Sequence, residues 1–502
     1  MKKPSNHLFK LIKSLTKSEK RAFRLNPAYR NEAKKYIAIF EAIDAQTEYD
    51  EEALKKKFKK EKWINRFNSA KEYVYKTLLN NLVIYNQKHE PHFELADLLV
   101  HIRVLQMKGF YEKCKKLIEK GKVLANEIDD YQKVLELYHL ESINHPGGIN
   151  PVNRSEILKQ QKKTLQLLDC ECTFNWLYKL SYQIFSKTGY AGFTEENIVA
   201  YRKIFDAPEM RDYKKALTFN SKRMFNNMHY FYALGTDNRN DMERWVMRTK
   251  DLFDQNPKYI KLQPVNYATT LLNVHDFYLK QGNFEKALEI LKKLRSFHPK
   301  EKLKEQERLT YIIEYGALHN EITTLNTMGK FQKSAEKINL LEVLAQKHQL
   351  EISESIYVRH LYLIAATYFG INDFKSCKKT LDTIFEIKNT GFRSDLIKRS
   401  KIMLFLVYFE LGKFDLLEYN VRSVKRFMSR NGELNDLEQQ LFKLVNHLLD
   451  GFANKEAAKK VLSRLYIIQK NKKYVPNYSE ILDWVEGKLT GISYAKIVEK
   501  KQ

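Results

Sequence analysis

The chain has 502 residues and a formal charge of +26, and 43% of its residues are hydrophobic and 29% charged. A single hydrophobic core stops growing at roughly 250–300 residues, so this length requires several domains or a repeat array. The composition excludes a disordered chain, and the scarcity of glycine (17) and proline (10) excludes a turn-rich β fold.

Residues 1–90 are predicted to form a basic helical N-terminal cap. Residues 1–40 alone hold 11 basic and 2 acidic side chains, and Thr16 and Glu19 have the spacing of a capping box. The short helix expected there carries candidate nucleic-acid contacts, which are Lys17, Lys20, Arg21 and Arg24. A second basic stripe would form if the helix predicted from residue 50 continued; it comprises Lys55, Lys59, Lys62 and Arg66. A lysine-rich surface that only keeps the protein soluble explains this charge equally well.

Residues 91–260 are predicted to form an irregular region of helical hairpins. A segment rich in proline and glycine at 145–151 predicts a loop and a break in any array. After it, separate helices are expected at 153–169 and 173–187, followed by three more up to residue 254.

A repeated junction marks residues 261–452. In each copy a Gly or Asn is followed two residues later by an aromatic residue and three residues after that by a residue in a small slot. The aromatic residues of the clearest copies are Phe284, Phe331, Phe374 and Phe414, spaced 47, 43 and 40 residues apart; an earlier copy has Gly109 and Tyr111. Gly or Asn supplies a positive φ that ends one helix, and the aromatic residue begins the next. Each copy therefore predicts a helical hairpin whose open face the next hairpin covers.

These junctions resemble tetratricopeptide repeats (TPRs), most closely at residues 268–301. The matching positions there include Leu271, Tyr278, Ala287 and Pro299. His275 and Leu294 stand where that family usually has glycine and alanine, which implies wider helix packing. The period exceeds the usual 34 residues. The longer period suggests a long-helix bacterial type of TPR-like protein of unassigned function. Residues 8–21 also resemble the start of such bacterial repeat proteins.

The resemblance implies a concave groove lined by the first helix of each hairpin, where the family binds protein or peptide segments. The family's groove positions fall on Asp276, Lys280, His319, Asn320, Thr323, Asn326, Arg359 and Tyr362. For any one of these residues, a solvated polar surface without a binding role is the simpler explanation. For the groove as a whole, binding is favoured, because a solenoid has an extended concave surface.

Residues 453–502, with 11 basic and 5 acidic side chains, are predicted to form basic C-terminal helices. No apolar run approaches the roughly 20 residues of a membrane span, and no apolar core follows the first six residues. Four cysteines provide no disulfide framework. We therefore expect a cytoplasmic protein without a membrane span.

The sequence contains no motif typical of an enzyme site. A phosphate-binding glycine loop, a G-x-S-x-G nucleophile motif and a zinc-type spacing of Cys and His are all missing. Cys170 and Cys172 form the one close cysteine pair, while Cys114 and Cys377 occupy the small slot of a repeat. We expect no catalysis, no cofactor and no bound metal.

The sequence thus predicts an all-α fold, an α-solenoid of TPR-like hairpins with a basic N-terminal cap. The leading hypothesis is a non-catalytic scaffold or adaptor that binds a protein or peptide segment in the groove. A nucleic-acid or ribosome-binding protein that uses the basic cap is the first alternative, and a peptide-sensing regulator is the second.

Overall fold

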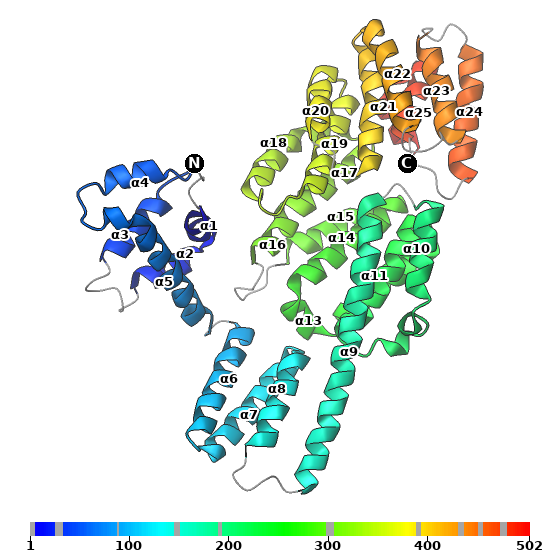
Figure 1. Cartoon of the computed structure of the whole chain (residues 1–502). Helices are drawn as coiled ribbons and strands as arrows, with labels where there is room; N and C mark the ends of the chain where they lie inside the picture. The colour runs from blue at the N-terminus through cyan, green and yellow to red at the C-terminus, as the bar shows by residue number, and fades with distance from the viewer. Residues whose placement is uncertain are drawn as a thin grey trace. The chain divides into compact units, whose positions relative to one another are not determined.

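The computed structural model describes residues 6–25, 34–87, 90–144, 151–188, 193–297, 306–387, 393–429, 436–449, 455–471 and 479–501. Every regular element in these ranges is a helix (Figure 1). The prediction of an all-α fold is confirmed. The chain divides into two compact units, Met1–Gln166 and Leu167–Gln502, and the boundary falls within helix α9.

The first unit contains two hydrophobic cores. One lies among the first five α-helices around Ile12, Phe23 and Phe40, and the other among α6, α7 and α8 around Ile102 and Leu137. The helices are α1 His7–Ser14, α2 Lys17–Leu25, α3 Lys34–Asp44, α4 Glu51–Lys57, the 3-10 turn η2 Ile64–Arg66, α5 Phe67–Gln87, α6 Pro91–Met107, α7 Tyr111–Glu127 and α8 Tyr131–Ile143.

Helix α9 spans Pro151–Thr188 without interruption. The two separate helices expected at 153–169 and 173–187 were therefore wrong. No proline or glycine lies between residues 152 and 188, so nothing in the local sequence ends the helix. The predicted loop at 145–151 lies mostly outside the described residues, and α9 already begins at Pro151.

The second unit continues with α10 Glu195–Phe205, two 3-10 turns (η4 Pro208–Met210 and η5 Tyr213–Lys215), α11 Phe219–Gly235, α12 Arg239–Asp254, α13 Pro257–Leu262, α14 Pro264–Lys280 and α15 Phe284–Arg295. Helices α16 Gln306–Tyr311 and α17 Ala317–Thr327 are joined by a π-helical turn, η6 Ile312–Gly316. There follow α18 Phe331–Lys347, α19 Glu354–Gly370, α20 Phe374–Glu386, α21 Ser394–Glu410, α22 Phe414–Ser429, α23 Asp436–Leu449, α24 Lys455–Asn471, α25 Ser479–Thr490 and α26 Tyr494–Lys500.

The repeated junctions form nearly identical turns between paired helices. The residue at the turn has a positive φ in every copy: 72° at Gly282, 73° at Gly329, 63° at Asn372, 66° at Gly412 and 76° at Gly109. The amide after it donates to the carbonyl oxygen five residues earlier, at 2.9 Å from Asn283 to Tyr278. The small-slot residue is completely buried in each copy; these residues are Cys114, Ala287, Ser334, Cys377 and Leu417. The spacing therefore predicted these hairpins correctly.

Two further turns of the same kind were missed. Asp129 and Asp237 adopt φ values of 54° and 49°, and they join α7 to α8 and α11 to α12. The amides of Asp130 and Asn238 donate to carbonyl oxygens five residues back, both at 2.9 Å. Aspartate enters the left-handed region more readily than most residues, yet it is a weaker sequence signal than glycine.

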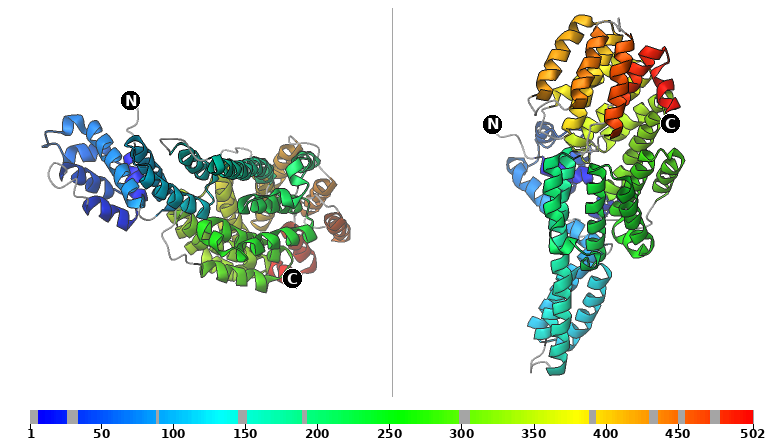
Figure 2. Two further views of the ribbon diagram at one scale, coloured as in Figure 1. Left: turned by 90° about the horizontal axis from the view of Figure 1, so that it is seen from below. Right: turned by 90° about the vertical axis from the view of Figure 1, so that its right-hand side faces the viewer.

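Consecutive hairpins of the second unit pack in chain order. The first helices lie side by side, α14 against α17, α17 against α19 and α19 against α21, and each second helix contacts the next first helix. The last hairpins share one large core with the C-terminal helices, and the yellow-to-red helices accordingly stay together in Figure 2 (right).

Candidate functional site

The eight residues predicted to line a groove lie on three neighbouring helices, α14, α17 and α19. We call the surface that these helices form together the first-helix face. None of the eight is fully exposed: His319 (3%), Asn320 (6%) and Tyr362 (7%) are buried and the others are half-buried. Three of the eight side chains are therefore packed inside the protein, and the other five remain partly open to solvent.

Hydrogen bonds join α17 to α19 at two places. Asn326 Nδ2 donates to Thr367 Oγ1 at 2.9 Å. Near the other end, Arg359 Nη2 lies 3.2 Å from His319 Nδ1. Burial, with the positive charge of Arg359, holds the pKa of His319 well below its usual value. A neutral imidazole can accept from the guanidinium, so this contact needs no proton on His319.

Sequence reasoning missed three further contacts on or beside this face. His275 Nε2 lies 2.9 Å from Thr324 Oγ1 and joins α14 to α17. Tyr315 Oη lies 3.3 Å from His360 Nδ1, and Tyr230 donates to the carbonyl oxygen of Asn273 at 3.1 Å. Of these contacts, only the one made by His275 had a signal in the sequence, because this histidine stands where the resembled family usually has glycine.

Asp276 and Lys280 are one helical turn apart at the end of α14. Asp276 Oδ1 lies 3.0 Å from His275 Nδ1, and the Lys280 ammonium lies 3.7 Å from Asp237 on the neighbouring turn. Burial lowers the pKa of Lys280, against the opposing effect of Asp237 and Asp276. Thr323 donates to the carbonyl oxygen of His319, so its hydroxyl is already partly satisfied.

The chain's own C-terminal helices contact one end of this face. Tyr362 donates to Glu480 of α25 at 2.8 Å, and Arg399 of α21 forms an ion pair with the same carboxylate. Trp484 of α25 donates to Glu410 of α21 at 2.7 Å. One predicted groove residue, Tyr362, thus does contact a helix, and that helix belongs to the same chain.

Helix α26 extends this contact toward α17 and α18. The Tyr494 ring packs against Phe331 and Phe369, with centroids 5.3 and 5.4 Å away. A Cβ at Gly329 would lie only 2.8 Å from the carbonyl oxygen of Ala495. The backbone of α26 therefore lies directly on the turn between α17 and α18.

The four predicted nucleic-acid contacts on α2 are not equally available. Lys20 and Arg24 form ion pairs with Asp44, and Arg24 also pairs with Glu41 at 3.5 Å. Lys17 and Arg21 are exposed. Half of this predicted positive surface is consequently neutralised by α3.

Among the described residues, no group of three or more His, Cys, Asp or Glu side chains is arranged to hold a metal ion. Within the same ranges, no helix has both the length and the apolar character needed to cross a membrane. The comparisons with known proteins add no family assignment: no family model, no curated protein and no solved structure matches this chain.

Proposed function

We propose that this chain is a non-catalytic, intracellular adaptor that holds a protein or peptide segment against the first helices of a TPR-like array. In this reading the hairpins from α11 to α22 form an α-solenoid, because each hairpin buries an open face against the next. The bound segment lies across α14 and α17, the part of the face next to the chain's own C-terminal helices.

The observation that carries the proposal is the docking of α25 on α19 and α21. Glu480 is held by a tyrosine hydroxyl and a guanidinium, and Trp484 adds an indole hydrogen bond to Glu410. The first helices of these hairpins thus accept a helix through a few fixed polar groups and aromatic contacts. A groove that recognises a helix elsewhere uses the same chemistry.

The neighbouring part of the face offers polar groups that are already oriented. Asn326, His319 and Arg359 are held by hydrogen bonds between helices, and Asp276 and Lys280 present opposite charges one turn apart. Side chains that are already fixed lose little further freedom on binding, which favours affinity from a small surface.

Photo-crosslinking tests this proposal directly. A photoreactive residue placed at Thr323 on the first-helix face should capture a partner in cells, and one placed at Glu289 on the exposed side of α15 should not. The partner should survive nuclease treatment. It should be lost in the variant D276A/K280A and retained in the charge-matched control E289A/K292A. Equal capture from both positions, or a partner unaffected by D276A/K280A, would place the binding surface elsewhere.

A further inference from the structure

A cluster of positive charge begins in the last turn of helix α4 in the N-terminal unit and continues beyond its end. Seven basic residues and one acidic residue lie between positions 53 and 66, a local charge of +6. We call the six exposed basic residues the basic corner; they are Lys56, Lys57, Lys59, Lys60, Lys62 and Arg66. None of the six has a carboxylate partner within the described part of the chain.

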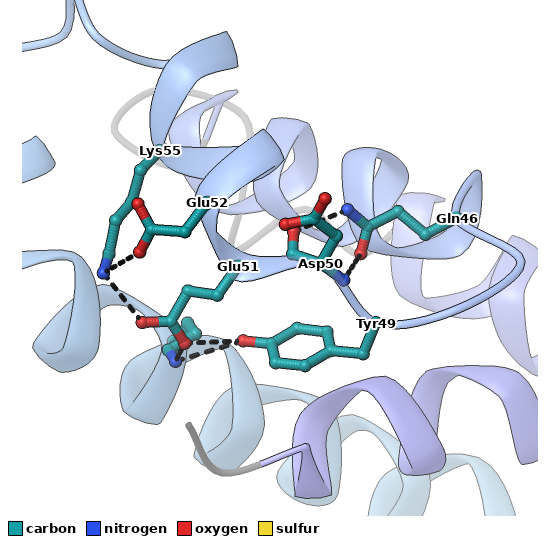
Figure 3. A network of polar contacts seen from close by, with 7 residues as sticks. Gln46, Tyr49, Asp50, Glu51, Glu52 and Lys55 are labelled. Carbon is teal, nitrogen blue, oxygen red and sulfur yellow. Dashed lines mark hydrogen bonds and ion pairs between the residues drawn. The ribbon is translucent and has the colours of Figure 1, made fainter. Parts of the chain in front are cut away.

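A buried network fixes the base of this corner (Figure 3). Glu51 at the start of α4 is 7% exposed and accepts hydrogen bonds from Tyr49 at 2.9 Å and from Lys71 of α5. Lys55 lies 3.1 Å from the same carboxylate. Asp50 caps the helix by accepting from the amide of Ala53 at 2.9 Å. The acidic end of α4 is thus anchored, and its other end presents the lysines.

Helix stabilisation does not account for the whole cluster. Lysines in the last turn of α4 interact favourably with the helix dipole, and this explains Lys56 and Lys57. Lys59, Lys60, Lys62 and Arg66 lie beyond the end of the helix at Lys57, where that effect has faded. Because α4 ends at Lys57, the continued helix on which a second basic stripe depended is not formed, whereas the charge is present.

We propose that the basic corner binds the phosphate backbone of double-helical nucleic acid, without reading its sequence. Unpaired lysines form a set of mobile point charges that suits the regular charge of a duplex and the release of its counterions. This contact does not depend on the proposed adaptor function, because the corner lies in the other unit of the chain.

The aromatic residues of the corner favour a duplex over a single strand. The Trp63 ring packs between Phe58 and Phe67, with centroids 5.1 and 6.3 Å away, and both phenylalanines are buried. Trp63 itself is half-buried between them, so little of its ring is open for stacking on unpaired bases, on which single-strand binding relies. Residues 51–72 also expose no large hydrophobic side chain, so a membrane surface would gain no apolar insertion here.

Fluorescence anisotropy with short DNA and RNA duplexes tests the proposal on the full chain. If the corner makes six phosphate contacts, the affinity should fall by a factor of about 10³ as the salt concentration rises from 50 to 200 mM. The variant K59Q/K60Q/K62Q removes three charges beyond the helix end and should reduce the slope of log K against log salt by about 3. The control K113Q/K115Q/K116Q removes three exposed lysines of α7 and should leave the slope nearly unchanged.

Three results would overturn the proposal, once circular dichroism shows that both variants remain folded. Equal losses in the two variants would mean that only the net charge matters. Tighter binding to a single strand than to the duplexes would contradict the argument from the packing of Trp63 against the two phenylalanines. Tighter binding to phosphatidylserine vesicles than to the duplexes would assign the corner to a membrane surface.

Discussion

The turn at Gly329 provides a direct test of how the C-terminal helices are seated. Gly329 and Gly282 occupy equivalent turns with φ values of 73° and 72°. Alanine in this left-handed conformation costs about 1–2 kcal/mol, partly offset by the loss of freedom of the unfolded chain. At Gly282 the added Cβ would meet no atom within 4 Å, so G282A measures the cost of the turn alone.

At Gly329 the same change should cost more. The new Cβ would lie 2.8 Å from the carbonyl oxygen of Ala495 and 3.0 Å from the amide nitrogen of Glu499. Both are backbone atoms of α26, which cannot rotate aside as a side chain would, so we expect an extra cost of about 1–3 kcal/mol. If α26 lifts away to relieve the clash, its opening equilibrium rises by about tenfold for every 1.4 kcal/mol.

Hydrogen exchange read by mass spectrometry would detect this opening in residues 494–501. G329A should exchange at least about fivefold faster there than G282A, while the peptides of α14 and α15 should exchange at similar rates in both variants. Indistinguishable exchange of α26 in the two variants would refute the reasoning, because the clash would then have been absorbed without moving the helix.

Three further predictions concern stability and reactivity. Burial lowers the pKa of His229 and of His360 to about 4, whereas the unfolded chain protonates histidine near 6.5. The contribution of these two histidines to the free energy of unfolding should therefore be fully present above about pH 6.5 and be lost as the pH falls toward 4. The midpoint of urea unfolding should accordingly lie at a lower urea concentration at pH 4.5 than at pH 7. E51Q should cost about 2 kcal/mol because it leaves the Lys71 ammonium without its carboxylate, with E52Q on the exposed side as the control in thermal unfolding. Cys172 is exposed while Cys114, Cys170 and Cys377 are buried, so a thiol reagent should modify one cysteine in the native protein and four after unfolding.

The hairpins could be predicted because their turns depend on local backbone chemistry. A positive φ, an aromatic residue two positions later and a small residue at the crossing of the two helices are constraints that neighbouring residues satisfy among themselves. The two aspartate turns were missed for the same reason, since the residue type at the turn was the signal. Helix α9 was divided wrongly, although its sequence has no proline or glycine between residues 152 and 188 that would end a helix.

The burial and hydrogen bonding of the predicted groove residues could not be derived from such local patterns. Asn326 and Tyr362 lie on first helices, but their contacts depend on partners 41 and 118 residues away, which are Thr367 and Glu480. A single sequence gives no such pairing. The same limit applies to Lys20 and Arg24, whose neutralisation by Asp44 depends on how α3 packs.

The hydrogen bonds between first helices bear on how the hairpins unfold. Repeat arrays often lose structure from their ends, because each unit is held only by its neighbours. Here His275 is bonded to Thr324, and Asn326 is bonded to Thr367. Opening one hairpin would break such a bond and expose its partner on the next hairpin to water, at a net cost of about 0.5–1.5 kcal/mol for each bond. We therefore expect α14, α17 and α19 to open together more readily than one at a time.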